Sequence, residues 1–535
     1  MSWLKDHLRF PVWLTAAESK LVAAAKEGGP ANYTVARDPD GANWGPERTI
    51  RAEVIYTLAT SKSLDVHAKG VRVLGAKITG VLDLEGAEVP HPLSLENCFI
   101  AEPIILRDAT ALMVSFEGSH VAGIQADRLH ARGDVILRNG FHAAGEVRLS
   151  GAKIGGDLDC LGGRFENANG PALNADAATV GGNVLLRNGF HAMGEVVLVA
   201  AKIGGNLECD GGRFENTKGY ALSASTATVN GNLFFHSGFQ ATGEVRLVGA
   251  KIGGQLACSG ATFSNPEHEG IALNLQRASV AATLFLSDLA TRPTGTVDLR
   301  YAQVGDLVDD EKSWPNAGKL RLDGFVYTRL ASDSTPWRAR DWRGNKGRLS
   351  WLSLQSVFHP QPYEQLAKVL RDMGHDGEAR EVEIAKREES RPGLGFGRGL
   401  WDWFLDRTIG YGLKPQRAGV GLLLALFFGW MLFQVASCNG VMVPAEKELV
   451  ANYQKNPTSL PPGYPEFRPF LYDLEVLVPG IDLSQKSKWR LQEKRPPNVA
   501  AVLYYLVWLG FVLDYIVWWV SFTLLGAALT GLLKA

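Results

Sequence analysis

The stretch AKIGGDLDCLGGRF, residues 152–165, is repeated as AKIGGNLECDGGRF at 201–214 and as AKIGGQLACSGATF at 250–263. The copies lie 49 residues apart, and a fixed period in this range is typical of solenoids and propellers. The 49-residue unit divides further, because PALNADAATVGGNVLLRNGF from residue 171 follows the same pattern as GEVRLSGAKIGGDLDCLGGRF from residue 145. The structural period is therefore about 24 residues.

Apolar residues alternate within each unit, as expected of strands that bury one face. The alternating positions in the first copy are Val147, Leu149, Leu158 and Cys160. The strands are short, and glycine pairs between them permit tight corners. This pattern predicts a mainly β protein built on a parallel β-helix, with coils stacked about 4.8 Å apart. The conserved positions of the repeat are then inward residues and corners, and three variable positions are predicted to face solvent: Asp157, Asn206 and Gln255.

The solenoid is predicted to span residues 65–330 in ten or eleven coils, because weaker copies of the 24-residue pattern lie before and after the three clear copies. Solenoid ends need caps, and the partly helical sequence of 1–64 is suited to one end. Residues 331–395 hold a predicted helical hairpin at 360–391, with Gly374 between its helices as a C-cap. A β-propeller is the alternative architecture, but its blades need longer strands.

Residues 396–535 are predicted to form a transmembrane domain. The uncharged stretch 418–437 matches the thickness of a bilayer core, and 515–533 is the second predicted crossing. The apolar segment 499–513 is predicted to be interfacial or packed on protein, with Asp514 at the junction, and 438–498 forms the loop between the crossings. An acid at membrane depth faces protein or water, so Asp514 is a candidate intramembrane polar or pore-lining residue.

No signal peptide precedes the solenoid, because charges and a proline interrupt the first 20 residues. We therefore expect a multi-pass protein of the bacterial inner membrane, with the N-terminal solenoid in the cytoplasm. The positive-inside rule argues against this orientation, since the loop 438–498 would lie outside and carries a basic cluster of Lys486, Lys488, Arg490, Lys494 and Arg495.

The charge balance of 55 Lys+Arg against 56 Asp+Glu does not indicate a nucleic-acid partner. The five cysteines are few, as in proteins that do not rely on disulfides. Three of them recur at one repeat position, namely Cys160, Cys209 and Cys258. Two coils separate neighbours by about 9.6 Å, beyond disulfide reach, so we interpret this column as part of the core.

Other recurring polar positions do not indicate a catalytic site. His142 and His191 recur, but Gln240 replaces them in the third copy, so we interpret them as solvent-facing. The acids Asp159 and Glu208 give way to Ala257, which leaves no fixed acid pair. Known nucleotide, metalloprotease and hydrolase motifs are missing from the sequence, and GLGFGRG at 393–399 is interpreted as a hinge. No cofactor or metal site is predicted.

The loop FRPFLYDLEVLVPGIDL, residues 467–483, is an apolar segment between the predicted crossings. A re-entrant pore loop would use Tyr472, Asp473, Pro479, Gly480 and Asp482. The segment lacks the run of carbonyl-donating residues that a potassium filter requires, so a packed segment outside the membrane is the favoured interpretation.

Four stretches together resemble a bacterial membrane-protein family: LDGFVYTRL from 322, QPYEQLAKVLRDMGHDGEAREVEIAKRE from 361, YGLKPQRA from 411 and YDLEVLVPGIDLSQKSKW from 472. The resemblance covers nearly the whole chain and implies glycine-rich β-solenoid repeats before a helical hairpin and a membrane segment. Some members carry the label "membrane-associated oxidoreductase", for which the sequence offers no cofactor motif. The family resemblance also implies a partial likeness to bactofilin and pentapeptide-repeat solenoids, which serve as scaffolds.

The sequence favours a non-enzymatic scaffold anchored in a lipid bilayer, which uses its solenoid for a protein partner or for homo-oligomer assembly. The alternative is an oligomeric pore or sensor in which Asp514 lines an aqueous path. An enzyme that matches the oxidoreductase label is the third hypothesis.

Overall fold

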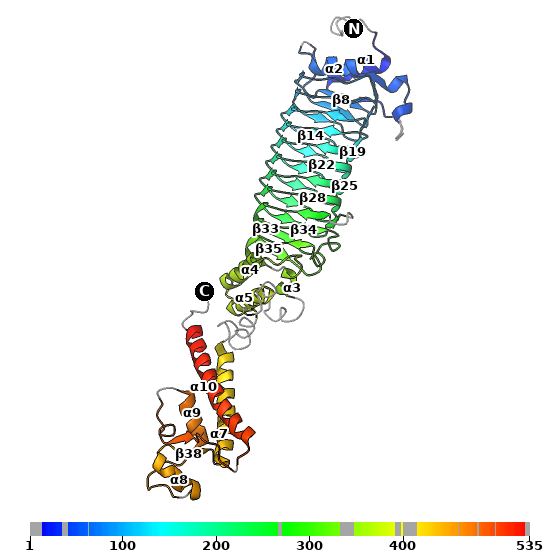
Figure 1. Cartoon of the computed structure of the whole chain (residues 1–535). Coiled ribbons are helices and arrows are strands. Elements are labelled where there is room, and N and C mark those ends of the chain that lie inside the picture. Colours follow the sequence, from blue (N-terminus) through cyan, green and yellow to red (C-terminus); the bar gives the residue numbers. More distant parts are fainter. Residues whose placement is uncertain are drawn as a thin grey trace. The chain divides into compact units, whose positions relative to one another are not determined.

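The computed structural model divides the chain into two compact units, Met1–Val382 and Glu383–Ala535. The first unit is a β-solenoid with helices at both ends (Figure 1). The second unit is mainly helical. The structure describes residues 13–34, 41–62, 64–265, 270–331, 347–390, 397, 399, 415–457, 459–478, 481–497 and 499–529.

The solenoid has about 11 turns of roughly 23 residues, which confirms the predicted β-helix. In the described residues, parallel pairing joins 21 strands into one sheet and 16 into another. Each sheet holds two columns of strands, so a coil passes in order through four faces. The coils alternate in length: Lys153 pairs with Thr179, 26 residues on, and Thr179 pairs with Lys202, 23 residues on. The 49-residue sequence period is one long and one short coil together.

Faces 1 and 2 belong to the larger sheet. Face 1 consists of β5 (Glu88–Val89), β9 (Thr110–Ala111), β13 (His130–Ala131), β17 (Lys153–Ile154), β20 (Thr179–Val180), β23 (Lys202–Ile203), β26 (Thr228–Val229), β29 (Lys251–Ile252) and the first parts of β33 (Ser279–Leu286), β35 (Gln303–Asp309) and β37 (Val326–Ala331). Face 2 consists of β1 (Ala31–Asn32), β3 (Val71–Leu74), β6 (Leu93–Glu96), β10 (Val114–Ser115), β14 (Val135–Ile136), β18 (Leu158–Asp159), β21 (Val184–Leu185), β24 (Leu207–Glu208), β27 (Leu233–Phe234), β30 (Leu256–Ala257) and the later parts of β33, β35 and β37.

Faces 3 and 4 belong to the second sheet. Face 3 consists of β2 (Thr49–Arg51), β4 (Lys77–Thr79), β7 (Phe99–Ile100), β11 (His120–Val121), β15 (His142–Ala143), β31 (Thr262–Ser264) and the first parts of β19 (Arg164–Asn174), β22 (His191–Val197), β25 (Arg213–Ser223) and β28 (Gln240–Arg246). Face 4 consists of β8 (Ile104–Ile105), β12 (Ile124–Gln125), β16 (Val147–Arg148), β32 (Ile271–Asn274), β34 (Thr296–Asp298), β36 (Leu320–Arg321) and the later parts of β19, β22, β25 and β28.

The solenoid core is built from columns of like residues. Six phenylalanines stack in consecutive coils with ring centroids 5.1–5.6 Å apart. They are Phe141, Phe165, Phe190, Phe214, Phe239 and Phe263, and all are fully buried. A coil cannot bury this apolar face by itself, so stacking is what creates the core.

Both ends of the solenoid carry helices. At the N-terminal end, Thr15 and Glu18 form a capping box that begins α1 (Ala16–Glu27), and Gly28 ends the helix with φ 76°. The helix α2 (Ala52–Thr60) follows β2, and the short 3₁₀ helices η1 (Gly41–Asn43) and η2 (Pro46–Arg48) precede it. The prediction begins the solenoid at residue 65, whereas β1 and β2 already pair with β3 and β4. The predicted cap, residues 1–64, therefore contributes strands to the solenoid as well as helices.

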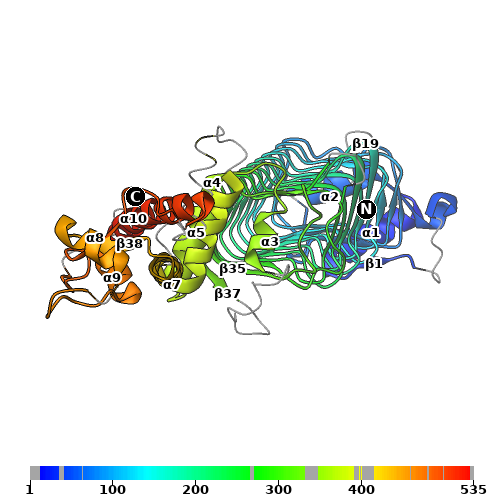
Figure 2. The ribbon, with the colours of Figure 1, turned by 60° about the horizontal axis from the view of Figure 1, so that its bottom comes forward.

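At the other end, α3 (Arg348–Leu352) and α4 (Pro360–Asp372) lie across the last coils (Figure 2). Gln365 of α4 donates a 2.6 Å hydrogen bond to the carbonyl of Tyr327 in β37, so the helix closes the open edge of the last coil. The helix α5 (Asp376–Ser390) follows, and Gly374 lies between α4 and α5 with φ 83°. These two helices match the predicted hairpin.

The second unit contains α7 (Pro415–Cys438), β38 (Met442–Pro444), α8 (Lys447–Lys455), α9 (Pro469–Leu477), β39 (Trp489–Leu491) and α10 (Ala501–Leu529). The strands β38 and β39 pair antiparallel. A small aromatic core includes Phe433, Tyr472 and Trp489. The prediction separates 499–513 from 515–533 at Asp514, whereas α10 runs through this position without a break.

Candidate functional site

The outward residues of face 1 form a regular stripe along the solenoid. They alternate between lysine and a small hydroxyl residue, and consecutive members pair in register. The lysine stripe consists of Lys153, Thr179, Lys202, Thr228, Lys251 and Ser279. Its members are exposed, with Thr228 only partly so. Neighbouring lysines are two coils, or about 9.6 Å, apart.

The side chains of the three lysines have no hydrogen-bond or ion-pair partner among the described residues. Arginines on the other faces differ, because most of them are held by an acid. The pairs include Arg107–Glu85, Arg138–Glu117, Arg148–Asp127, Arg187–Glu208, Arg246–Glu244 and Arg300–Asp298. The arginines therefore contribute to the folded surface itself, whereas the lysines remain available to an anionic group from outside.

The surface beside the lysine stripe is flat, because the next outward position is glycine in most coils. At Gly181 a Cβ would lie 2.3 Å from the carbonyl oxygen of Gly155, and at Gly204 it would lie 2.2 Å from that of Gly181. No Cβ fits at such distances, so these two positions require glycine. The repeated glycines thus form a ledge along most of the stripe, which the exposed Asn230 interrupts.

A polar ladder runs beside this ledge. The side-chain oxygen of each member accepts a hydrogen bond from the backbone N–H of the next: Asp157 from Asn183 at 2.6 Å, Asn183 from Asn206 at 2.9 Å and Asn206 from Asn232 at 2.9 Å. The ladder continues to the backbone N–H of Gln255. The prediction that Asp157 and Asn206 simply face solvent is therefore wrong, because their side chains satisfy backbone donors at the corners. Gln255 ends the ladder as a backbone donor, so the prediction for its side chain stays a prediction.

Face 4 carries an acidic counterpart to the lysine stripe. Glu146, Glu195 and Glu244 stand seven residues before Lys153, Lys202 and Lys251, where face 4 leads into face 1 of the next coil. We call these three residues the glutamate column. Glu146 lines an open groove of about 330 Å³ with Gly123, Gln125 and Arg148, and burial raises the pKa of Glu195.

The long coils instead carry a bulge on the same side of the solenoid. Asn167 donates a 2.9 Å hydrogen bond to the carbonyl of Pro171, and Asn216 does the same to Tyr220. These bonds close the extra residues of β19 and β25 into matching bulges. On face 4, the short coils therefore carry the glutamates, and the long coils carry a bulge.

The recurring histidines of face 3 are paired across coils. His191 lies 3.1 Å from Glu215, and His142 lies 3.4 Å from Glu166. Burial raises the pKa of Glu215, but hydrogen bonds from His191 and Arg213 outweigh it and hold that pKa below its ordinary value. The interpretation of these histidines as solvent-facing is therefore only partly right, since they are half-buried and belong to an ion-pair network.

The cysteine column lies in the core, as predicted. Cys160, Cys209 and Cys258 are fully buried and unpaired, and burial raises the pKa of each thiol. Leu186 and Phe235 occupy the same position in the coils between them. The thiols are thus packed among apolar side chains and have no access to a reagent.

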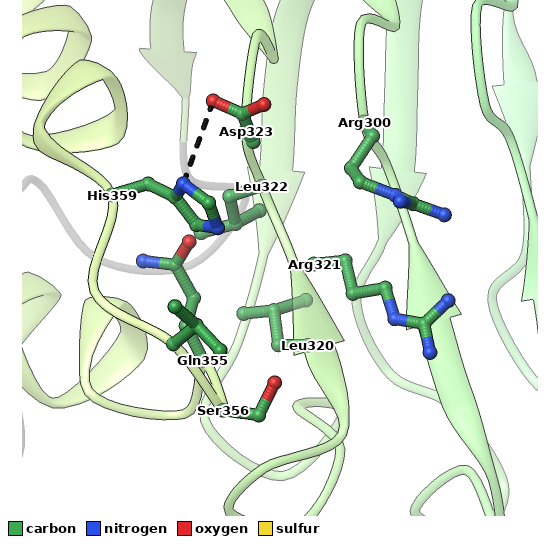
Figure 3. Close-up of a pocket in the computed structure, with 9 residues that line it drawn as sticks. Arg300, Leu320, Arg321, Leu322, Asp323, Gln355, Ser356 and His359 are labelled. Atoms are coloured by element: carbon green, nitrogen blue, oxygen red, sulfur yellow. Dashed lines mark ion pairs between the residues drawn. The ribbon is translucent and has the colours of Figure 1, made fainter. Parts of the chain in front are cut away.

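A pocket of about 190 Å³ lies at the C-terminal end of the solenoid (Figure 3). Arg300 and Arg321 line it, and both donate to the fully buried carboxylate of Asp298. His359 lies 3.9 Å from Asp323. The guanidinium groups point away from His359, and the volume is below that of typical ligand pockets. We interpret this cluster as a set of ion pairs that stabilises the last coils of the solenoid.

The predicted loop residues of the second unit do not gather into a filter. Tyr472 and Asp473 lie buried on α9, which packs on α7 and α10. Asp482 lies beyond α9, where its carboxylate accepts a hydrogen bond from the backbone N–H of Ser484. Pro479 and Gly480 lie outside the described residues, as do most of residues 393–399. Asp514 is a residue of α10 whose side chain is not described.

Two helices of the second unit expose large apolar side chains. In α7, Gly419–Cys438 is long and apolar enough to cross a membrane, and only 17% of its most apolar window is buried. Ala501–Leu513 of α10 is a shorter apolar segment. The exposed residues include Leu423, Leu424, Phe427, Phe428, Met431, Val502, Tyr505, Leu509 and Phe522. An exposed apolar surface of this kind marks a membrane or protein interface.

Comparison of the chain with family models, with curated proteins and with solved structures found no match. The site therefore rests on the geometry of this chain. The reasoning from sequence did not single out the lysines, although one signal was present: each copy of AKIGG retains lysine at a position that the alternation places outside.

Proposed function

We propose that this protein is a non-enzymatic, membrane-attached scaffold whose solenoid docks an acidic partner on the lysine stripe. The observation that carries the proposal is the stripe itself, because it presents regularly spaced charges that no acid in the described part of the chain neutralises. A merely structural surface would pair these charges, as the arginines of the neighbouring faces do. Such pairing is weak at the surface, so unpaired lysines cost the fold little.

The exposed apolar side chains of α7 and α10 support attachment to a lipid bilayer. A 20-residue helical segment is about 30 Å long, which is the thickness of a bilayer core. We place the protein in the bacterial inner membrane with the solenoid in the cytoplasm, and the resemblance to a bacterial membrane-protein family supports the membrane location. The resemblance to membrane-anchored solenoid proteins agrees with this function.

Membrane attachment is tested by extracting membranes that contain the full chain with alkaline carbonate. We expect the wild-type protein to stay with the lipid and the L424K/F428K variant to be released, because a charge at the centre of a spanning helix costs about 2.5–3.5 kcal/mol. Both residues are exposed, so the substitutions do not disturb the core of the unit. Protease added to cytoplasm-side-out vesicles should digest the solenoid. Release of the wild-type protein by carbonate would contradict the proposal.

A further inference from the structure

The lysine stripe and the glutamate column have the same period. Each lysine follows its glutamate by seven residues, so Lys202 follows Glu195 and Lys153 follows Glu146. The lysines do not pair with these glutamates inside the chain. The third glutamate, Glu244, is buried and pairs with Arg246, so the complementary charges on the adjacent faces are those of the lysines and of the half-buried Glu146 and Glu195, both at two-coil spacing.

We propose that the anionic partner of the lysine stripe is a second copy of this chain, which docks its glutamate column against the stripe in parallel and in register. The inference deepens the scaffold function proposed above and rests on it. A partner must match a spacing of about 9.6 Å between neighbouring lysines, and Glu146 and Glu195 of another solenoid of the same sequence do so by construction. Side chains on one face of an extended peptide recur about every 6.7 Å instead.

In a parallel pair of solenoids, coils of the same number lie at the same level. Lys202 of one copy then faces Glu195 of the other, and Lys153 faces Glu146. The net charge of −1 adds no long-range repulsion between copies.

The surfaces of both faces suit this contact. The glycine ledge leaves room beside the lysines for an approaching backbone, and the stripe lacks an exposed acid between Lys153 and Ser279. On the opposing side, the groove at Glu146 is open to a lysine side chain. Surface charge pairs are individually weak, so the regular repetition of the pairs is what makes the contact specific.

The test is cross-linking in native membranes between two differently tagged full chains, one with K202C and the other with E195C. Both carry C438A, because Cys438 is the exposed cysteine and the other four are buried. A short bis-maleimide replaces the length of the lysine and glutamate side chains. We expect a product with both tags, at least tenfold more abundant than the product of K202C with E146C, which lies one repeat out of register.

A charge exchange gives a second readout that does not depend on cysteine. K202E alone and E195K alone should each lower the amount of the two-tag complex recovered from membranes, and co-expression of the two variants should restore it. Matched reversal of the exposed Lys218, which lies on a bulge, should leave recovery unchanged.

The outcomes separate this inference from the scaffold proposal. Chains that remain in the membrane but give no K202C–E195C product overturn the inference and leave membrane attachment standing. A K202C adduct to another protein also overturns it, since the partner is then not a second copy. Chains that carbonate removes from the membrane contradict the proposed function, whatever the cross-linking shows.

Discussion

The solenoid and the helical unit are stabilised in different ways. The solenoid repeats the same packing in each coil, so each phenylalanine of the core stacks on its neighbours in the coils before and after it. The helical unit has one small core around Phe433, Tyr472 and Trp489, and leaves the outer sides of α7 and α10 apolar and exposed. The first unit buries most of its apolar residues in its own core, whereas the described part of the second exposes many of them on two helices.

The largest expected effect lies in the phenylalanine stack. Phe214→Ala removes a ring that contacts Phe190 and Phe239, and we expect a loss of about 3–5 kcal/mol in the free energy of unfolding of the solenoid. The measurement is denaturant unfolding in detergent, followed by the β signal in circular dichroism. Phe214→Leu is the control, with a smaller loss. A loss below 1 kcal/mol for the alanine variant would mean that the stack is not a source of stability.

The helical unit should respond to a close contact between α7 and α9. A Cβ on Gly429 would lie 2.2 Å from a carboxylate oxygen of the buried Asp473, so we expect Gly429→Val to destabilise this unit by about 1–3 kcal/mol. Thermal unfolding followed by tryptophan fluorescence checks this.

Gly421 is the matched control for that substitution, because a Cβ there meets no atom within 4 Å. The β signal of the solenoid should not change in either variant. If Gly429→Val lowered the melting temperature of the solenoid as well, the two units would not unfold separately.

The polar ladder should show an intermediate effect. Asn206→Ala removes the acceptor for the backbone N–H of Asn232, and an unsatisfied backbone donor costs about 1–3 kcal/mol. Asn206→Asp keeps the acceptor oxygen and imitates Asp157 in the same ladder, so its loss should be smaller. Equal losses in the two variants, measured by denaturant unfolding, would rule out the ladder as the reason for the preference for Asp and Asn.

The smallest effect is expected from the ion pairs of face 3. The folded-state pKa of Glu215 is lowered against its ordinary value of 4.5, so its contribution to stability is present above that pH and is lost as the pH falls through the lowered value. Because the pair is partly exposed, the contribution is about 1 kcal/mol or less. Glu215→Gln should make the melting temperature less sensitive to acid below pH 4.5. An unchanged pH profile would show that the pair is not stabilising.

The repeated unit made the solenoid predictable from the sequence. Alternation around Leu158 and Cys160 indicated which residues lie inside, and the structure bears this out. The same pattern did not reveal the ladder of Asp157 and Asn206, because a short polar side chain at a corner can face water or bond the next coil. The distance between the side-chain oxygen and the backbone N–H of the next coil decides between these alternatives, and this distance is known only from the structure.

The helical unit was less predictable, because its sequence contains no repeated pattern whose copies could be compared. Hydropathy located α7 but divided α10 at Asp514, because a charged residue in an apolar run suggests a boundary although it does not break helical hydrogen bonds. The lysine stripe was missed for another reason. Each lysine is unremarkable alone, and the stripe becomes visible only when the register places Lys153, Lys202 and Lys251 in one line.

The most direct test of the lysine stripe as the docking surface is the mass of the full-length complex in mild detergent, measured by native mass spectrometry. We predict more than one copy for the wild-type protein and a single copy for K153E/K202E/K251E. The control variant K69E/K218E/K312E changes the net charge equally at exposed lysines outside the stripe and should keep the wild-type mass. The same mass for all three proteins would contradict the account.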